Sequence, residues 1–250
     1  MKVEPPHPDW IVPDWPAPAN VRAFITTRTG GVSEGPFTSF NLGLRAGDDS
    51  QSVTVNRERL RAMIPAEPKW LRQVHGNVVA DADTLVDIPE ADASVARRPG
   101  TVCVIQIADC VPVLLTDRAG TTVAIAHAGW RGLASGVVEK TIERTALAAG
   151  NLIAYLGPGI GPRAFEVGAD VRDAFITADP GSDAAFSPHV PGKWLADLFT
   201  LARRRLSAAG VTGVYGGRDC TYSDAKRFYS YRRDRTTGRM AALIWIQRDE

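Results

Sequence analysis

The chain has 250 residues, of which 44% are hydrophobic and 23% charged, and its formal net charge at pH 7 is +1. This composition is typical of an ordinary globular protein, and the near-neutral charge argues against nucleic-acid binding, which needs a basic surface. Three cysteines cannot form a paired disulfide framework, which favours a reducing compartment. The chain has no apolar signal core near its start and no apolar stretch of the roughly 20 residues that span a bilayer. We therefore expect a cytoplasmic protein that binds neither nucleic acid nor a membrane.

Proline punctuation and hydrophobic patterning predict the organisation of the chain. Six prolines within residues 1–20 predict an irregular N-terminal segment, and the absence of repeats and linkers predicts a single domain over residues 21–250. The expected strands are 21–27, 69–75, 78–80, 101–107, 111–116, 122–126, 152–156, 211–215, 227–231 and 240–246. The expected helices are 53–64, 133–149, 170–177 and 194–209.

Turn signals and caps refine these elements. Gly76-Asn77 predicts a hairpin between the strands at 69–75 and 78–80, and residues 236–238 predict a second hairpin before the last strand. Gly150 and Gly210 stand where C-caps of the second and fourth helices are expected. The strand–helix–strand rhythm does not persist along the chain, so we expect an α+β domain of mixed β-sheets with packed helices rather than a doubly wound fold.

Three potential metal ligands share one placement in the sequence. His75, Cys110 and His127 each lie at the end of an extended apolar run. One cysteine and two histidines at strand ends are suited to a zinc site with one open coordination position. The other two histidines are poorer candidates, because His7 lies in the irregular segment and His189 stands between prolines.

Cys110 needs separate weighing, because a lone cysteine is more often a buried structural thiol than a functional group. Its neighbour Asp109 is costly to bury unless the carboxylate is paired or orients a ligand. Two chemistries then remain. In one, all three residues bind zinc; in the other, Cys110 is a nucleophile that a histidine activates. The second histidine is surplus in the nucleophile chemistry, which favours the metal.

Arginines supply the other candidate binding groups. Arg57 and Arg131 lie in segments with aromatic or glycine neighbours, and a guanidinium binds phosphate or carboxylate in a bidentate manner. Most arginines of a chain are solvated surface charges, so only these two are selected as substrate- or phosphate-binding residues. The glycine-rich loop 157–161 is a weaker indication of phosphate binding.

These motifs together resemble the YfiH-type family, also called the laccase-domain or multicopper polyphenol oxidase family and peptidoglycan editing factor. The resemblance extends from about residue 21 to residue 246. The motifs that carry it are Asn56-Arg57, Gln73-Val74-His75-Gly76, Ala108-Asp109-Cys110-Val111-Pro112, His127-Ala128-Gly129-Trp130-Arg131-Gly132, Gly157-Pro158-Gly159-Ile160-Gly161, Ser230-Tyr231-Arg232-Arg233 and Thr237-Gly238-Arg239.

The resemblance implies a purine nucleoside phosphorylase, which cleaves adenosine, inosine or methylthioadenosine with phosphate to a free base and ribose 1-phosphate. Some members of the family also deaminate adenosine. The family's metal ligands correspond to His75, Cys110 and His127 here, with zinc as the usual metal and copper as the alternative, and Asp109 stands beside the ligand cysteine as a further catalytic candidate.

Two other activities stay open at this stage. The family's fold is shared with a deamidating bacterial toxin of the cytotoxic-necrotizing-factor type, which keeps a metal-free Cys–His amidase or deamidase, acting on cell-wall precursors, as an alternative. A copper-dependent polyphenol oxidase is the least favoured, because a multicopper cluster is built mostly from imidazoles and the chain has only four histidines.

Overall fold

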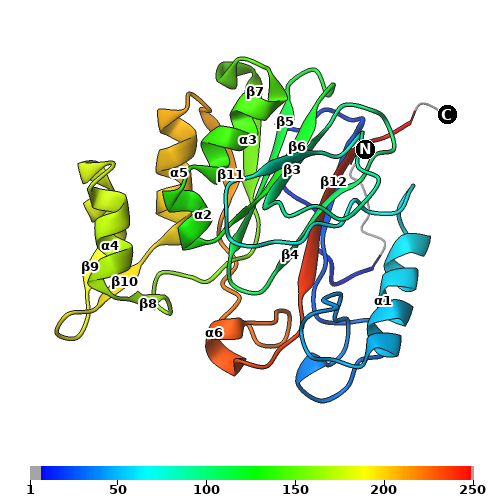
Figure 1. Ribbon diagram of the computed structural model, residues 1–250, viewed down its shortest axis with the longest axis horizontal. Coiled ribbons are helices and arrows are strands. Elements are labelled where there is room, and N and C mark those ends of the chain that lie inside the picture. The colour runs from blue at the N-terminus through cyan, green and yellow to red at the C-terminus, as the bar shows by residue number, and fades with distance from the viewer. Residues whose placement is uncertain (1–6, 249–250) are drawn as a thin grey trace.

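Two β-sheets lie face to face and carry helices on their outer sides in the computed structural model, which describes residues 7–248 (Figure 1). The larger sheet has the order β11-β7-β5-β6-β3-β2, and the smaller sheet has the order β1-β12-β4. The larger sheet comprises β2 (Val79–Asp81), β3 (Ala93–Ala96), β5 (Val111–Asp117), β6 (Val123–Ala128), β7 (Leu152–Leu156) and β11 (Gly213–Gly216). The smaller sheet comprises β1 (Val21–Ile25), β4 (Cys103–Ile107) and β12 (Met240–Ile246).

The remaining elements cover these sheets or extend from them. The helices are α1 (Ser50–Ala62), α2 (Trp130–Ala134), α3 (Val137–Thr145), α4 (Ala169–Ile176), α5 (Leu198–Ala208) and α6 (Tyr231–Asp234). A third, small sheet beside α4 comprises β8 (Glu166–Val167), β9 (Phe186–Pro188) and β10 (Trp194–Ala196). Within residues 7–248, none of the helices has the length and apolar character needed to cross a membrane.

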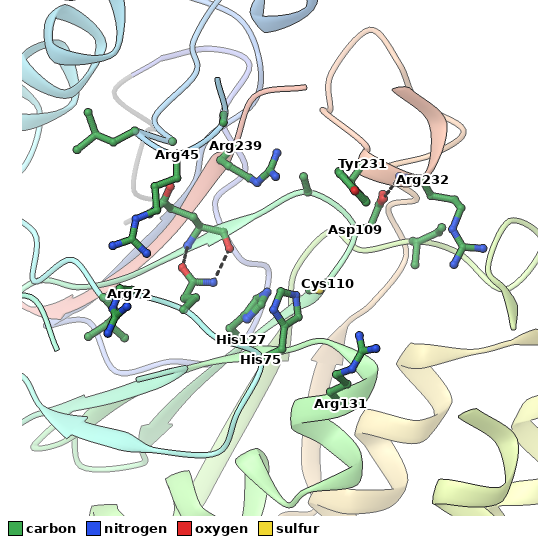
Figure 2. Close-up of a pocket in the computed structure, with 18 of the residues that line it drawn as sticks. Arg45, Arg72, His75, Asp109, Cys110, His127, Arg131, Tyr231, Arg232 and Arg239 are labelled. Carbon is green, nitrogen blue, oxygen red and sulfur yellow. Dashed lines mark hydrogen bonds between the residues drawn. The ribbon is translucent and has the colours of Figure 1, made fainter. Parts of the chain in front are cut away.

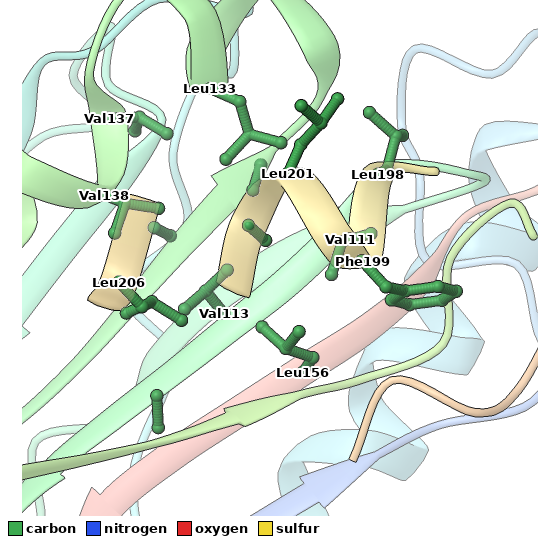
Figure 3. Close-up of a cluster of buried hydrophobic side chains, with 14 of the residues drawn as sticks. Val111, Val113, Leu133, Val137, Val138, Leu156, Leu198, Phe199, Leu201 and Leu206 are labelled. Atoms are coloured by element: carbon green, nitrogen blue, oxygen red, sulfur yellow. The ribbon is translucent and has the colours of Figure 1, made fainter. Parts of the chain in front are cut away.

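Strand alternation explains why the central strands are buried on both faces. In β5, Val113 packs toward α3 and α5, whereas the next residue, Leu114, packs toward the smaller sheet. Figure 3 shows the first of these clusters, in which side chains of α2, α3 and α5 cover the larger sheet. In β12, Ile244 faces the larger sheet while Leu243 faces a third cluster that includes Leu60 of α1. The molecule is therefore layered as helices, sheet, sheet and helix, with a core between each pair of layers.

The fold class is confirmed: this is an α+β domain whose larger sheet mixes parallel and antiparallel pairs. The strands at 152–156 and 240–246 are confirmed residue for residue, and the strand at 111–116 is confirmed within one residue. The first six residues of the expected irregular N-terminal segment lie outside the described residues. Residues 7–20 have no helix or longer strand and pair with the smaller sheet through one bridge, Ile11 to Ile25.

Both predicted hairpins are wrong. Residues 69–75 form only isolated bridges, and β2 pairs in parallel with β3 instead of folding back on them. The cause is that the backbone N–H groups of Val74, His75 and Gly76 bind a carboxylate rather than a facing strand. Residues 227–231 form no strand either, because Ser230 accepts a hydrogen bond from the backbone of Arg233 and caps α6.

Two predicted helices are interrupted. The predicted helix at 133–149 is two helices, α2 and α3, which are separated at Gly136 by a left-handed backbone with φ of 87°. The predicted helix at 194–209 begins with the strand β10, and α5 starts only after Asp197, whose side chain caps Phe199 and Thr200. In both cases hydrophobic periodicity continues through a residue whose local geometry breaks the helix.

The loop that leads from β1 to α1 depends on one buried amide. Asn56 of α1 is fully buried, and its side chain accepts a hydrogen bond from Val32 N at 2.9 Å and donates to Ser33 Oγ and to Asn41 O, each at 2.9 Å. Substitution Asn56→Ala should lower the free energy of unfolding by about 2–3 kcal/mol, because it leaves buried polar groups without partners.

Chemical denaturation measures this change, and Glu58→Ala, at an exposed position on the same helix, is the matched control with an expected effect below about 0.5 kcal/mol. Equal effects of the two substitutions would contradict the assigned role of Asn56.

Candidate metal centre

The structure brings His75, Cys110 and His127 together, and we call them the His–Cys–His group (Figure 2). The nearest candidate ligand atoms of the three side chains all lie within 4.8 Å of one another. Strand register accounts for part of this: Val111 pairs with Ala128 across β5 and β6, which sets the residue before Val111, Cys110, beside the end of β6. His75 reaches the same point from the loop before β2, and its ring centroid lies 4.9 Å from that of His127.

Asp92 fixes both histidines of this group. Its fully buried carboxylate accepts hydrogen bonds from the backbone N–H groups of Val74, His75 and Gly76 at 3.1, 3.0 and 2.8 Å. The same carboxylate lies 2.8 Å from Nδ1 of His127, which leaves Nε2 of that ring for a metal. Sequence reasoning assigned no role to Asp92; the available signal was an acidic residue between two alanines.

The contacts inside the group favour an ionised thiol. Burial alone would raise the pKa of Cys110, but the nearby His127 and then His75 lower that pKa to about 6. Burial likewise opposes the charge on His127, but the neighbouring Cys110 thiolate and the Asp92 carboxylate raise the pKa of the imidazole to about 9. A soft thiolate beside two imidazoles is a donor set that suits zinc.

Of the two alternatives for Asp109, a paired carboxylate or one that orients a ligand, the structure shows a paired carboxylate. It accepts hydrogen bonds from Thr221 Oγ1 at 2.7 Å and from the backbone N–H of Arg232 at 2.6 Å. Asp109 itself has a left-handed backbone with φ of 98° in the connection from β4 to β5. The residue therefore ties the start of α6 to the segment that presents Cys110.

A pocket of about 700 Å³ opens over the group, and its charged lining residues are almost all arginines. Its arginines are Arg45, Arg57, Arg72, Arg131, Arg232, Arg235 and Arg239, and its one acidic lining residue is Asp109. Both arginines selected from the sequence lie here. The Arg57 guanidinium stacks 3.8 Å from the ring centroid of Trp70, and that of Arg131 lies 4.5 Å from the ring centroid of Trp130. Sequence reasoning selected none of Arg45, Arg72 and Arg235 as binding residues, although Arg72 directly precedes the motif at 73–76.

Comparisons with known proteins assign the chain to a family. The family model described as multi-copper polyphenol oxidoreductase laccase matches residues 22–247. The chain belongs to this laccase-domain family.

Several family members are similar over nearly their whole length. The purine nucleoside phosphorylase PA4543 of Pseudomonas aeruginosa is 54% identical over 239 residues, which cover 95% of this chain and 98% of that protein. The purine nucleoside phosphorylase YfiH of Escherichia coli K12 is 52% identical over 242 residues, which cover 94% and 98%. The crystal structure of protein NMB0706 from Neisseria meningitidis matches with a TM-score of 0.93 and 50% identity, and the match covers 96% of this chain and 100% of that one. The resemblance to the YfiH-type family is thereby confirmed.

In this laccase-domain chain, Gly129 provides the space that the Cys110 sulfur occupies. A Cβ atom at position 129 would lie 2.7 Å from Cys110 Sγ and 3.2 Å from His75 Cδ2, although the backbone φ of −73° is ordinary. Substitution Gly129→Ala should therefore displace two members of the group and weaken zinc binding roughly tenfold or more, as measured by competition with a chromophoric chelator. Gly150→Ala, at a site where the added Cβ meets nothing within 4 Å, is the control. Unchanged zinc affinity of Gly129→Ala would contradict the assignment of this group as a metal site.

Removing the negative charge of Asp92 should also weaken zinc binding. Asp92→Asn keeps the shape of the side chain but removes the charge and one acceptor, so zinc affinity should fall roughly 10- to 100-fold. Asp117→Asn is the matched control, because Asp117 is another buried carboxylate that accepts backbone N–H groups, in its case from Thr121 and Thr122. The control should lose stability in denaturation but retain its zinc affinity; equal losses of zinc affinity would contradict the assignment.

Proposed function

We propose that the protein is a purine nucleoside phosphorylase with zinc bound by His75, Cys110 and His127. The observation that carries the proposal is the coincidence, in one pocket, of the His–Cys–His group with seven arginines and a single carboxylate. Two relatives that are more than half identical to this chain are named purine nucleoside phosphorylases, which supports the same activity here. The volume of about 700 Å³ lies in the usual range for pockets that enclose small organic ligands.

The donor set fits a zinc ion and leaves room for a substrate atom. Three protein ligands of the nitrogen and sulfur type, with a fourth position open to the pocket, are the arrangement of catalytic zinc sites. When bound, the ion would supply Lewis acidity toward the purine or lower the pKa of a water molecule. The same donor set would also accept copper, so the metal bound in the cell is part of the proposal.

The other side chains of the pocket bind phosphate or hold the site in position. Arg131 or Arg57 binds phosphate, for which a guanidinium offers paired donors in a plane. Asp92 holds His75 and His127 in place, and Asp109 holds the start of α6 against the pocket. Phosphorolysis breaks the bond from ribose C1′ to the purine nitrogen and forms a bond from C1′ to a phosphate oxygen, while the base takes up a proton.

The proposal includes adenosine, inosine and methylthioadenosine as substrates, and deamination of adenosine as a second reaction at the same site. An activated water in the open position supports deamination. Localisation in the cytoplasm agrees with the presence of a cysteine that must stay reduced in order to bind a metal.

One observation favours a second candidate function, a metal-free Cys–His amidase or deamidase. The pKa of Cys110 is about 6, because His127 and His75 outweigh the effect of burial, and a thiolate of this kind is a nucleophile. This candidate predicts that activity survives chelation and that an electrophile labels Cys110. A polyphenol oxidase is disfavoured, because only two of the four histidines lie in the pocket.

Turnover of adenosine tests the proposal. Purified protein with adenosine and phosphate should release adenine and ribose 1-phosphate, measured by chromatography; chelation should abolish the reaction and zinc should restore it. Cys110→Ala should reduce turnover to background, because it removes a ligand of the proposed zinc. Cys220→Ala, which changes a cysteine that does not line the pocket, is the control and should remain active. Full turnover of Cys110→Ala, or full activity after chelation, would overturn the zinc assignment.

A further inference from the structure

The pocket carries more positive charge than one phosphate requires. Of its seven arginines, only Arg72 forms an ion pair, with Glu90, among the residues that the structure describes. The single lining carboxylate, that of Asp109, is already engaged by Thr221 and by the backbone of Arg232. Six guanidinium groups therefore converge on one pocket of a nearly neutral chain without a carboxylate to balance them. A neutral nucleoside and one phosphate dianion would satisfy only part of this charge.

The unpaired arginines fall into two groups on different walls. Figure 2 shows Arg45 and Arg239 on one side of the His–Cys–His group, with Arg131 and Arg232 on the other. Arg131 lies two residues after Gly129, where an added Cβ atom would lie 2.7 Å from Cys110 Sγ, so this wall adjoins the His–Cys–His group. The opposite wall combines the loop that precedes α1, which carries Arg45, with the segment before β12, which carries Arg239.

That opposite wall is rigidly built. Asn41, which is fully buried, accepts hydrogen bonds from the backbone N–H groups of Gly43 at 2.9 Å and of Arg239 at 2.8 Å. The stem of Arg239 crosses the loop at Gly43, where a Cβ atom would lie 2.7 Å from Arg239 Cγ. The guanidinium of Arg239 donates to the carbonyls of Thr237 and Gly238. These contacts fix the position of the cation before any ligand arrives.

Arg57 lies on the same wall, where burial disfavours its positive charge. Its Nε donates to Leu42 O at 3.0 Å, and its guanidinium lies flat against Trp70. Burial lowers the pKa of Arg57 to about 10, even though the negative charge of Glu67 opposes the change. A half-buried cation that pairs with no carboxylate is stabilised when an anionic ligand binds it.

We propose that Arg45, Arg57 and Arg239 form a second anion subsite, which binds the phosphate ester of a purine nucleoside monophosphate while inorganic phosphate binds beside Arg131. This inference rests on the proposed function and names its substrate class. Phosphorolysis of such a nucleotide breaks the bond from C1′ to the purine nitrogen and forms a bond from C1′ to a phosphate oxygen. The base takes the proton, and the second product is ribose 1,5-bisphosphate.

Binding without turnover tests the subsite first. Calorimetric titration in phosphate-free buffer should show that zinc-loaded protein binds adenosine 5′-monophosphate at least about tenfold more tightly than adenosine. One charge-assisted hydrogen bond to the phosphate is enough for an affinity gain of this size. Arg45→Gln should remove most of this preference. The Arg45 side chain is exposed and has no hydrogen-bond partner among the described residues, so its loss does not disturb the fold. Arg239→Gln is the second variant, and Arg118→Gln, an exposed arginine outside the pocket, should keep the full preference.

The competing outcomes are distinct. Equal affinity for the two ligands, or a preference that survives both Arg45→Gln and Arg239→Gln, would overturn the proposal. Inorganic phosphate that competes for the Arg45 subsite as tightly as the nucleotide binds would overturn its assignment to an ester.

Turnover then separates the two proposals. With inorganic phosphate, the monophosphate should yield adenine and ribose 1,5-bisphosphate, with a lower KM than adenosine shows; no such product would overturn the substrate assignment. Turnover of adenosine without any preference for the monophosphate would defeat the second subsite alone. Arg45-dependent nucleotide binding without turnover of either compound would defeat the proposed phosphorolysis instead.

Discussion

The carboxylate of Asp92 is the contact on which the candidate site depends, because it joins two parts of the chain that no strand pairing connects. On one side it binds three successive backbone N–H groups and so imposes the left-handed turn at His75, whose φ is 63°. On the other side it fixes the imidazole of His127 at the end of β6. A buried charge with this many partners is stabilised, whereas the same charge without them would be costly.

The stacking of the two sheets provides the frame for that contact. The segment 108–110 passes from β4 in the smaller sheet to β5 in the larger one, so Cys110 lies where the chain changes sheets. Asp109 holds this crossing to α6 through Thr221 and Arg232. Both faces of β5 and β12 are covered by other layers, which leaves little freedom for the group to shift. The strands that present Cys110 and His127 thus belong to the most buried part of the protein.

The charged groups of the pocket determine which ligands it favours. The thiolate of Cys110 favours a cation at the His–Cys–His group, while the surrounding arginines favour anions in the space above it. A ligand that presents phosphate to the walls and an uncharged ring to the centre would satisfy both, and a phosphorylated purine nucleoside has this form. Arg57 and Arg239 differ from surface arginines, because the burial that lowers the pKa of each makes an unpaired positive charge less stable.

The sequence by itself determined the α+β class, the placement of His75, Cys110 and His127 after apolar runs, and a family membership that the comparisons confirm. Those features depend on local patterns and on motifs, which can be recognised without knowing where the chain turns. The hairpins, the break at Gly136 and the role of Asp92 were decided only by the tertiary structure. There, a carboxylate 16 to 18 residues further along the chain competes successfully for the N–H groups that a hairpin would have used. The pairing of backbone groups across such distances depends on packing of the layers, which no local pattern encodes.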